Sequence, residues 1–131
     1  MADSLSGRER PGKTILFFYG TLKRGMPQSY LLKGQEFLAE AATIAQYRLY
    51  DLGPYPGLVQ ASPTEGVAVQ GELWAVDDAM LPKLDEYEGA PELFVREDVI
   101  IQHHFEPVQA YFYNGTVPAD ALWGECWPLP G

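Results

Sequence analysis

An uninterrupted apolar run near the start of the chain predicts a strand that is buried on both faces. Residues 14–19 read TILFFY, which is β-branched and aromatic without a polar break. Such a run is typical of a strand whose two faces are both covered. Residues 1–13 are polar and contain Ser, Gly and Pro, so we expect them to form a flexible N-terminal leader.

Four further segments combine apolar residues with strand-forming composition. Strands are predicted at residues 37–50, 66–76, 93–103 and 108–113, followed by a short final element at 123–127. The alanines of the first segment leave a helix open as an alternative there. Gly71 interrupts the second segment and is interpreted as a bulge.

One helix is predicted in the middle of the chain, from residue 77 or 78 to about Tyr87. Met80, Leu81 and Leu84 recur at helical spacing, and Asp77 or Asp78 can cap the start. A shorter helix is predicted at 29–33, where it ends before Gly34. Residues 20–29 and 51–57 read as loops because Gly and Pro punctuate them.

This order of elements predicts an α+β fold class. Strands come first, one helix follows, and strands return, so the repeated βα units of a doubly wound parallel sheet are missing from the pattern. We expect a curled, mostly antiparallel sheet. Nothing divides the chain after the leader, so residues 14–131 are expected to form a single domain.

Composition and charge narrow the function classes. The 131 residues are 47% hydrophobic and 13% aromatic, which argues against disorder. The formal charge of −9 disfavours nucleic acid and anionic membrane surfaces as partners. No apolar run is long enough to span a bilayer. Cys126 is the single cysteine and no signal peptide opens the sequence, so a cytoplasmic protein is expected.

The first candidate site follows the apolar strand, in residues 18–25 (FYGTLKRG). Gly20 allows the backbone to approach a ligand, and consecutive N–H groups in such a turn can bind an anion. Lys23 and Arg24 are expected to add positive potential there. The alternative is an ordinary turn between a strand and a loop.

The second candidate site is the end of the predicted helix, where residues 84–89 read LDEYEG. Carboxylates are unfavourable at the negative end of a helix dipole. Mutual repulsion and burial would both raise the pKa of a carboxyl group there, and such a group can transfer protons near neutral pH. The alternative is a solvated acidic helix end.

Other chemistry has less support in the sequence. His103 and His104 are adjacent in a predicted strand, so they should point to opposite faces, and no cluster of metal ligands accompanies them. Nothing near Cys126 would stabilise its thiolate, and no Gly-x-Ser-x-Gly motif occurs. No phosphate-binding or dinucleotide-binding motif is present, so neither a metal nor a cofactor is expected.

The two candidate sites together resemble motifs of the γ-glutamylcyclotransferase-like family, which includes γ-glutamylamine cyclotransferases and AIG2-like plant proteins. Residues 17–25 (FFYGTLKRG) are similar to the opening motif of that family, and residues 84–89 to its acidic motif Leu-Asp-x-x-Glu-Gly. Residues 94–96 (FVR) are similar to the aromatic-x-Arg step that usually follows. The segments 49–57, 69–74 and 111–113 extend the resemblance over residues 14–127.

The resemblance implies a small mixed β-barrel with short flanking helices. It implies that Glu88 is the catalytic acid/base, and that Tyr19, Gly20, Thr21 and Leu22 bind substrate, chiefly through backbone groups. The implied reaction releases 5-oxoproline from a γ-glutamyl amide: the substrate's α-amine attacks its own γ-carbonyl and expels an amine. No metal or cofactor is implied, and the implied partner is a small γ-glutamyl compound.

Several alternatives stay open at this point. The leaving group could be an amino acid, the side chain of lysine or another amine, and the loops around Gln28, 51–57 and 114–121 are expected to select it. A non-catalytic binding module on the same fold is the alternative from another class. The protein is expected to be a monomer or a homodimer.

Overall fold

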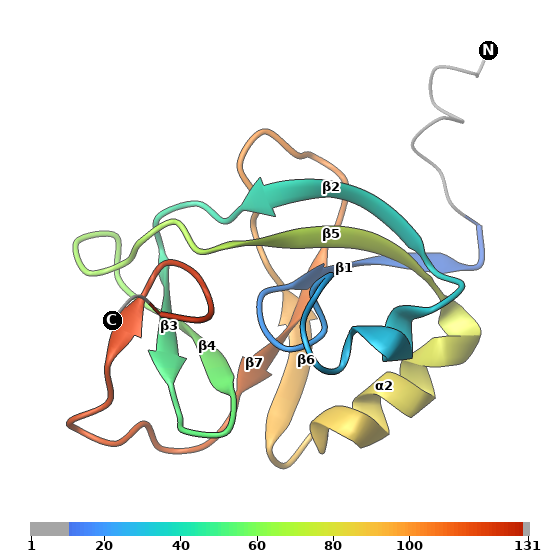
Figure 1. The fold of residues 1–131 in the computed structure, drawn as a ribbon. Coiled ribbons are helices and arrows are strands. Elements are labelled where there is room, and N and C mark those ends of the chain that lie inside the picture. Colours follow the sequence, from blue (N-terminus) through green and yellow to red (C-terminus); the bar gives the residue numbers. More distant parts are fainter. Residues whose placement is uncertain (1–10, 130–131) are drawn as a thin grey trace.

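The structure is a computed structural model that describes residues 11–129, and a strongly curled sheet forms most of it (Figure 1). Its strands are β1 (Lys13–Phe18), β2 (Glu36–Ala42), β3 (Tyr47–Asp51), β4 (Pro56–Gln60), β5 (Gln70–Asp77), β6 (Phe94–Asp98), β7 (Gln109–Tyr113) and β8 (Trp123–Gly124). Its helices are the 3-10 helices η1 (Ser29–Leu32) and η2 (Asp78–Met80) and the α-helix α2 (Leu81–Glu88). Within the described residues, no helix is long and apolar enough to cross a membrane.

Strand β7 is the point of the sheet where three other strands meet. The strand order is β2-β5-β1-β7-β4-β3-β8, and β6 pairs with β7 along its whole length. β1 and β4 both run parallel to β7, β1 at the Leu16–Gln109 pair and β4 at the Leu58–Phe112 pair. The other strand pairs are antiparallel. The predicted α+β class with a curled, mostly antiparallel sheet is confirmed.

Two apolar cores lie on the two faces of β1, and they explain its unbroken apolar sequence. Successive side chains of a strand point to opposite faces. Ile15 and Phe17 enter one core with Leu49, Leu58 and Phe112, and Leu16 and Phe18 enter the other with Trp74, Leu84, Phe94 and Tyr111. The prediction that this strand is buried on both faces is therefore confirmed.

The helix α2 rests on the second core through Leu84, its one fully buried side chain. Eight residues are too few for a stable isolated helix, so packing has to hold it in place. The expected cap at Asp77 or Asp78 is wrong, because neither side chain caps the helix start and Asp78 instead accepts a hydrogen bond from Thr14 at 2.7 Å. Gly89 ends the helix in the left-handed conformation, with a φ of 70°.

Other predicted elements have different bounds because strand pairing decides where they end. The segment 37–50 contains the two strands β2 and β3, so its helical alternative is wrong. Strand β6 ends at Asp98, where its partner β7 begins, instead of continuing to residue 103. The predicted loop 51–57 already contains the start of β4, which the Pro and Gly residues concealed in the sequence.

Three further expectations need correction. Gly71 is not a bulge: the register shift lies in β2, and a Cβ atom on Gly71 would come within 2.5 Å of the Phe18 carbonyl oxygen. His103 lies in a turn with a φ of 58°, so the two histidines do not belong to a strand. The final element is shorter than expected and consists of β8 alone. Residues 1–10 of the expected leader lie outside the described residues, and β1 already begins at Lys13.

Candidate active site

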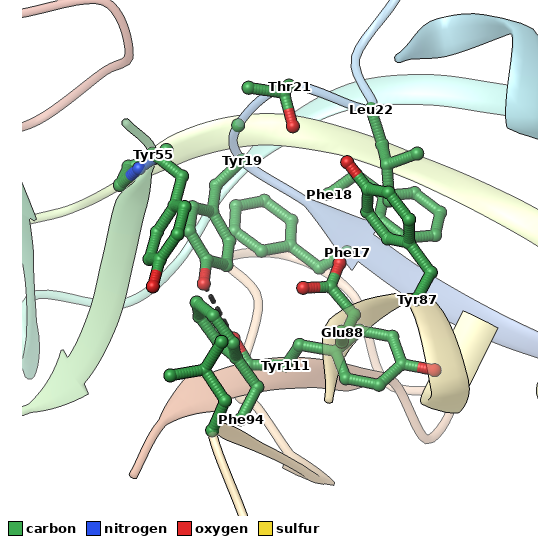
Figure 2. Close-up of a pocket in the computed structure, with 13 residues that line it drawn as sticks. Phe17, Phe18, Tyr19, Thr21, Leu22, Tyr55, Tyr87, Glu88, Phe94 and Tyr111 are labelled. Carbon is green, nitrogen blue, oxygen red and sulfur yellow. Dashed lines mark hydrogen bonds between the residues drawn. The ribbon is translucent and has the colours of Figure 1, made fainter. Parts of the chain in front are cut away.

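A pocket of about 210 Å³ lies where β1 ends, beside the start of β4 and the end of α2. This volume suits a ligand smaller than a typical drug molecule. The wall is made of residues 17–22, Tyr55, Pro56, Tyr87, Glu88, Leu93, Phe94 and Tyr111 (Figure 2). The two segments that the sequence singled out separately, the turn after the first strand and the end of the helix, therefore line the same pocket.

Glu88 is the last residue of α2 and the one charged side chain among the described residues of this wall. Its carboxyl group points into the space between Tyr19, Phe17 and Tyr87 (Figure 2). Burial away from water raises the pKa of Glu88 to about 7, because the ionised form loses hydration that the pocket does not replace. A carboxyl group with this pKa can both accept and donate a proton near neutral pH.

The expected repulsion between neighbouring carboxylates is not the cause of this shift. Asp85, one turn earlier on α2, is paired with the Arg96 guanidinium at 2.9 Å. Hydrogen bonds from Arg96 hold the pKa of Asp85 below its usual range. The negative charge of Asp85 is therefore compensated, and burial alone accounts for the raised pKa of Glu88.

The turn of residues 20–22, called the amide turn below, faces this carboxyl group across the pocket. The carbonyl groups of Gly20 and Thr21 accept hydrogen bonds from Lys23 N–H at 3.2 Å and Gln28 N–H at 3.0 Å. Among the described residues, the backbone hydrogen bonds of turns and loops include none that is donated by the N–H groups of Gly20, Thr21 or Leu22. Unpaired N–H groups at a pocket wall can donate to an anion or a developing oxyanion.

Tyr19 has a structural role that sequence reasoning did not find. Its buried hydroxyl donates to the Tyr111 carbonyl at 2.6 Å and accepts from the Leu58 N–H at 3.2 Å. These two bonds join the end of β1 to β7 and β4. Burial raises the pKa of Tyr19, so the hydroxyl stays protonated and keeps donating.

Besides the expected close approach of backbone to ligand, there is a steric reason for glycine at position 20. A Cβ atom at this position would lie 2.7 Å from Cγ of Pro56. The small residue lets the end of β1 pass against the start of β4, and that contact fixes the position of the amide turn. The backbone of Gly20 still lines the pocket.

Lys23 and Arg24, which were expected to add positive potential to the site, do not line the pocket. The Lys23 ammonium group donates to the Trp127 carbonyl at 2.7 Å. Arg24 pairs with the buried Glu72 at 3.1 Å, and its guanidinium stacks 3.6 Å from the ring centre of Phe37. Both side chains anchor the loop from outside the pocket, so a bound anion would meet backbone N–H groups and hydroxyl groups of the wall and no cationic side chain among the described residues.

Aromatic side chains form the rest of the wall. Tyr55 and Phe94 pack edge to face with ring centres 5.7 Å apart, and Tyr111 closes the wall from β7 (Figure 2). Of the loops expected to select the leaving group, 51–57 reaches the pocket through Tyr55 and Pro56. The likeness of segments 49–57 and 111–113 to the family was the signal in the sequence that could have marked these residues.

The residues set aside in the sequence lie elsewhere. His103, His104 and Cys126 do not line the pocket. Among residues 11–129, no three His, Cys, Asp or Glu side chains gather closely enough to hold a metal ion.

Comparisons with known proteins identify the family of the chain. A family model described as gamma-glutamyl cyclotransferase, AIG2-like, matches residues 16–127. A relative from Vibrio cholerae, named provisionally as a gamma-glutamylcyclotransferase, is 35% identical over 102 residues, or 78% of this chain and 84% of the relative. The human gamma-glutamylaminecyclotransferase is 37% identical over 95 residues, or 67% of this chain and 61% of the relative.

The fold is shared with solved structures as well. The crystal structure of an AIG2-like protein from Mus musculus superposes with a TM-score of 0.79 at 25% identity, and 88% of each chain is covered. The matched residues 16–127 include the amide turn and Glu88, which are the two sides of the pocket. The chain therefore belongs to the gamma-glutamyl cyclotransferase, AIG2-like family.

Proposed function

We propose that this protein is a γ-glutamylcyclotransferase that releases 5-oxoproline from a γ-glutamyl amide, with Glu88 as the general acid/base. The names of its relatives support the reaction class. The observation that carries the residue assignment is that the carboxyl group of Glu88 lies in the same pocket as the backbone turn of residues 20–22, and burial there raises the pKa of Glu88 to about 7.

The reaction needs no group beyond the substrate and a proton carrier. The substrate's α-nitrogen forms a bond to its own γ-carbonyl carbon, and the bond from that carbon to the departing amine breaks. Ionised Glu88 takes a proton from the α-ammonium group and gives it to the departing nitrogen. The second proton, which the α-nitrogen loses as the lactam forms, follows the same route, so the amine leaves as an ammonium ion and charge and atoms balance. Holding the glutamyl chain in a ring-like conformer supplies a large rate gain, with effective molarities of roughly 10⁵ to 10⁸ M.

The amide turn serves the negative groups of the substrate. The α-carboxylate is anionic throughout, and the γ-carbonyl oxygen becomes anionic as the ring closes. The N–H groups of Gly20, Thr21 and Leu22 can donate to either of these groups. Because no cationic side chain lines the described wall, the groups available to orient the glutamyl part are these N–H groups, the hydroxyl groups of the wall and Glu88.

A panel of γ-glutamyl compounds with different leaving groups tests the proposal. We expect mass spectrometry to detect 5-oxoproline from at least one compound with the wild-type protein. Glu88→Gln should keep the fold and substrate binding but lose most of the turnover, because glutamine cannot carry the proton. The leaving group of the best substrate then identifies the substrate class.

Two outcomes would contradict the proposal. Full activity of Glu88→Gln would remove this residue from the mechanism. A compound that binds tightly and is recovered unchanged across the panel would instead indicate a non-catalytic binding module. Circular dichroism of both proteins controls for folding.

A further inference from the structure

Asp85 lies one helical turn before Glu88 and outside the pocket wall, yet it makes the strongest polar contacts of α2. Its Oδ1 accepts from the Tyr111 hydroxyl at 2.5 Å and from Arg96 Nε at 2.9 Å, and its Oδ2 accepts from Arg96 Nη2 at 3.1 Å. Arg96 also donates through Nη1 to Gln109 at 2.8 Å. The paired, two-pronged contact fixes both the distance and the orientation of the helix relative to β6 and β7.

The last turn of the helix depends on this contact, because several other contacts of the segment lie toward its start: Met80 and Leu81 pack against the second core, and Asp78 accepts from Thr14. α2 has eight residues, no side-chain cap at its start and one fully buried side chain, Leu84. Within the described part of the chain, the Asp85–Arg96 pair is the one ion pair that joins α2 to the sheet. The position of the last turn, which carries Glu88, is therefore set largely by Asp85.

The same contact continues beneath the pocket to its opposite side. The Tyr111 side chain that binds Asp85 also forms part of the pocket wall, and the Tyr111 carbonyl accepts from the Tyr19 hydroxyl at 2.6 Å. Tyr19 directly precedes the amide turn. Tyr111 thus connects the two sides of the pocket: its hydroxyl binds the helix that carries Glu88, and its carbonyl binds the residue that precedes the amide turn.

We propose that Asp85 is a positioning residue, which holds Glu88 inside the pocket and aimed at the amide turn through its contacts with Arg96 and Tyr111. This inference rests on the proposed function for its catalytic consequence. Its structural consequence, that Glu88 stays buried only while Asp85 is paired, can be measured without turnover.

The surroundings of Glu88 give this role a specific signature. The titratable groups that interact with it are Tyr19 from β1, Tyr87 from α2 and Tyr111 from β7, and burial raises the pKa of each. All three are uncharged near neutral pH, so burial is what keeps the pKa of Glu88 high. Loosening α2 would admit water and return the pKa of Glu88 toward its ordinary value of about 4.3.

Two variants and a matched control test the role. Asp85→Asn replaces an acceptor oxygen with an N–H₂ group that faces Arg96, and Arg96→Lys keeps the charge but cannot form the two-pronged contact. Asp78→Asn is the control: it is also an acid-to-amide change, at the far end of the same helical segment, and keeps an acceptor for Thr14. The readouts are kcat, KM and a carbon-13 NMR titration of the Glu88 carboxyl group.

We expect kcat to fall by roughly 10- to 100-fold in both test variants, because small misplacements of a catalytic group are costly. KM should change by less than about threefold, since the amide turn is intact. The NMR titration should show the pKa of Glu88 moving down in both variants and unchanged in Asp78→Asn.

Two results would overturn the inference. One is a Glu88 pKa and a kcat that match wild type in both test variants. The other is a loss of activity that follows the unfolded fraction while the Glu88 titration stays unchanged, which would indicate a purely structural role. If the wild-type protein forms no 5-oxoproline at all, the proposed reaction fails, but the NMR titration still decides the positioning role.

Discussion

Among the described residues, no cationic side chain lines the pocket beside Glu88, and the protonation of Glu88 is decided by how much water reaches it. Burial makes the ionised form costly, which raises the pKa and makes the group a better proton donor. The same property costs folding stability at any pH where the carboxyl group is ionised in the unfolded chain. Function and stability are thus opposed at this one residue.

This opposition predicts a pH-dependent stabilisation by Glu88→Gln. The unfolded carboxyl group ionises near pH 4.3 and the folded one near pH 7, so the folded state loses stability as the pH rises through this window. At about pH 8 the variant should unfold with a higher free energy than wild type, by at most about 4 kcal/mol. At about pH 3 the gain should vanish, because Glu88 is then protonated in both states.

Denaturant unfolding of both proteins at the two pH values measures this difference. An equal gain at both pH values would mean that the amide packs better than the carboxyl group, and it would contradict a raised pKa.

Single functional residues could be predicted from the sequence where a motif contained them. They could not be predicted where the direction of a side chain decides its role. Glu88 and the amide turn could be singled out from local residue types and from the family resemblance. The direction of Lys23 and Arg24 could not, because a positive charge in the sequence does not show which surface it faces. The Asp85–Arg96 pair joins residues 11 positions apart, and neither residue indicates the other in the sequence.

The amide turn is positioned by one close contact between the strands β1 and β4. The end of β1 passes the start of β4 at Gly20 and Pro56, with no room for a side chain on the glycine. Because the turn follows directly, its N–H groups are displaced if the two strands separate. The geometry of the anion-binding groups is therefore a consequence of strand packing.

Substitutions at the contact between Gly20 and Pro56 test whether strand packing positions the amide turn. Gly20→Val should weaken substrate binding, with KM rising by roughly tenfold or more, because the new side chain clashes with Pro56 and moves the turn. Adding Pro56→Ala should restore part of the loss, since it removes the ring atoms that the valine meets. Steady-state kinetics of the single and double variants measure the effect, and an unchanged KM in Gly20→Val would contradict the role of the turn.

The elements themselves were predictable where the residue pattern is local. The apolar run of β1 and the spacing of α2 are strong signals, and both elements are present. β4 was missed because its Pro56 and Gly57 resemble a turn, whereas in the sheet Gly57 is required by the close approach of Leu52 and Tyr113. Strand ends such as Asp98 depend on the partner strand, which sequence patterns do not reveal.

At the level of the whole molecule, the pocket forms because β1 and β4 pair with different parts of the same strand, β7. β1 and β4 share one edge of β7, and the pocket lies where the end of β1 meets the start of β4, with α2 beside them (Figure 1). Its acid comes from α2 and its N–H groups from the turn that follows β1. Its aromatic wall includes Tyr55, which directly precedes β4, Phe94 of β6 and Tyr111 of β7. The α+β class was predictable from the order of elements, but this convergence depends on strand pairings between residues far apart in the sequence.

The pH dependence of 5-oxoproline formation tests the account most directly, since it joins the chemistry of Glu88 to turnover. With the best substrate of the panel, kcat/KM of the wild-type protein should rise with pH through an apparent pKa near 7, as Glu88 ionises and becomes able to accept the substrate's proton. Glu88→Gln should remain nearly inactive from about pH 5 to about pH 9. A wild-type profile without a transition near pH 7, or comparable turnover in the variant, would contradict the account.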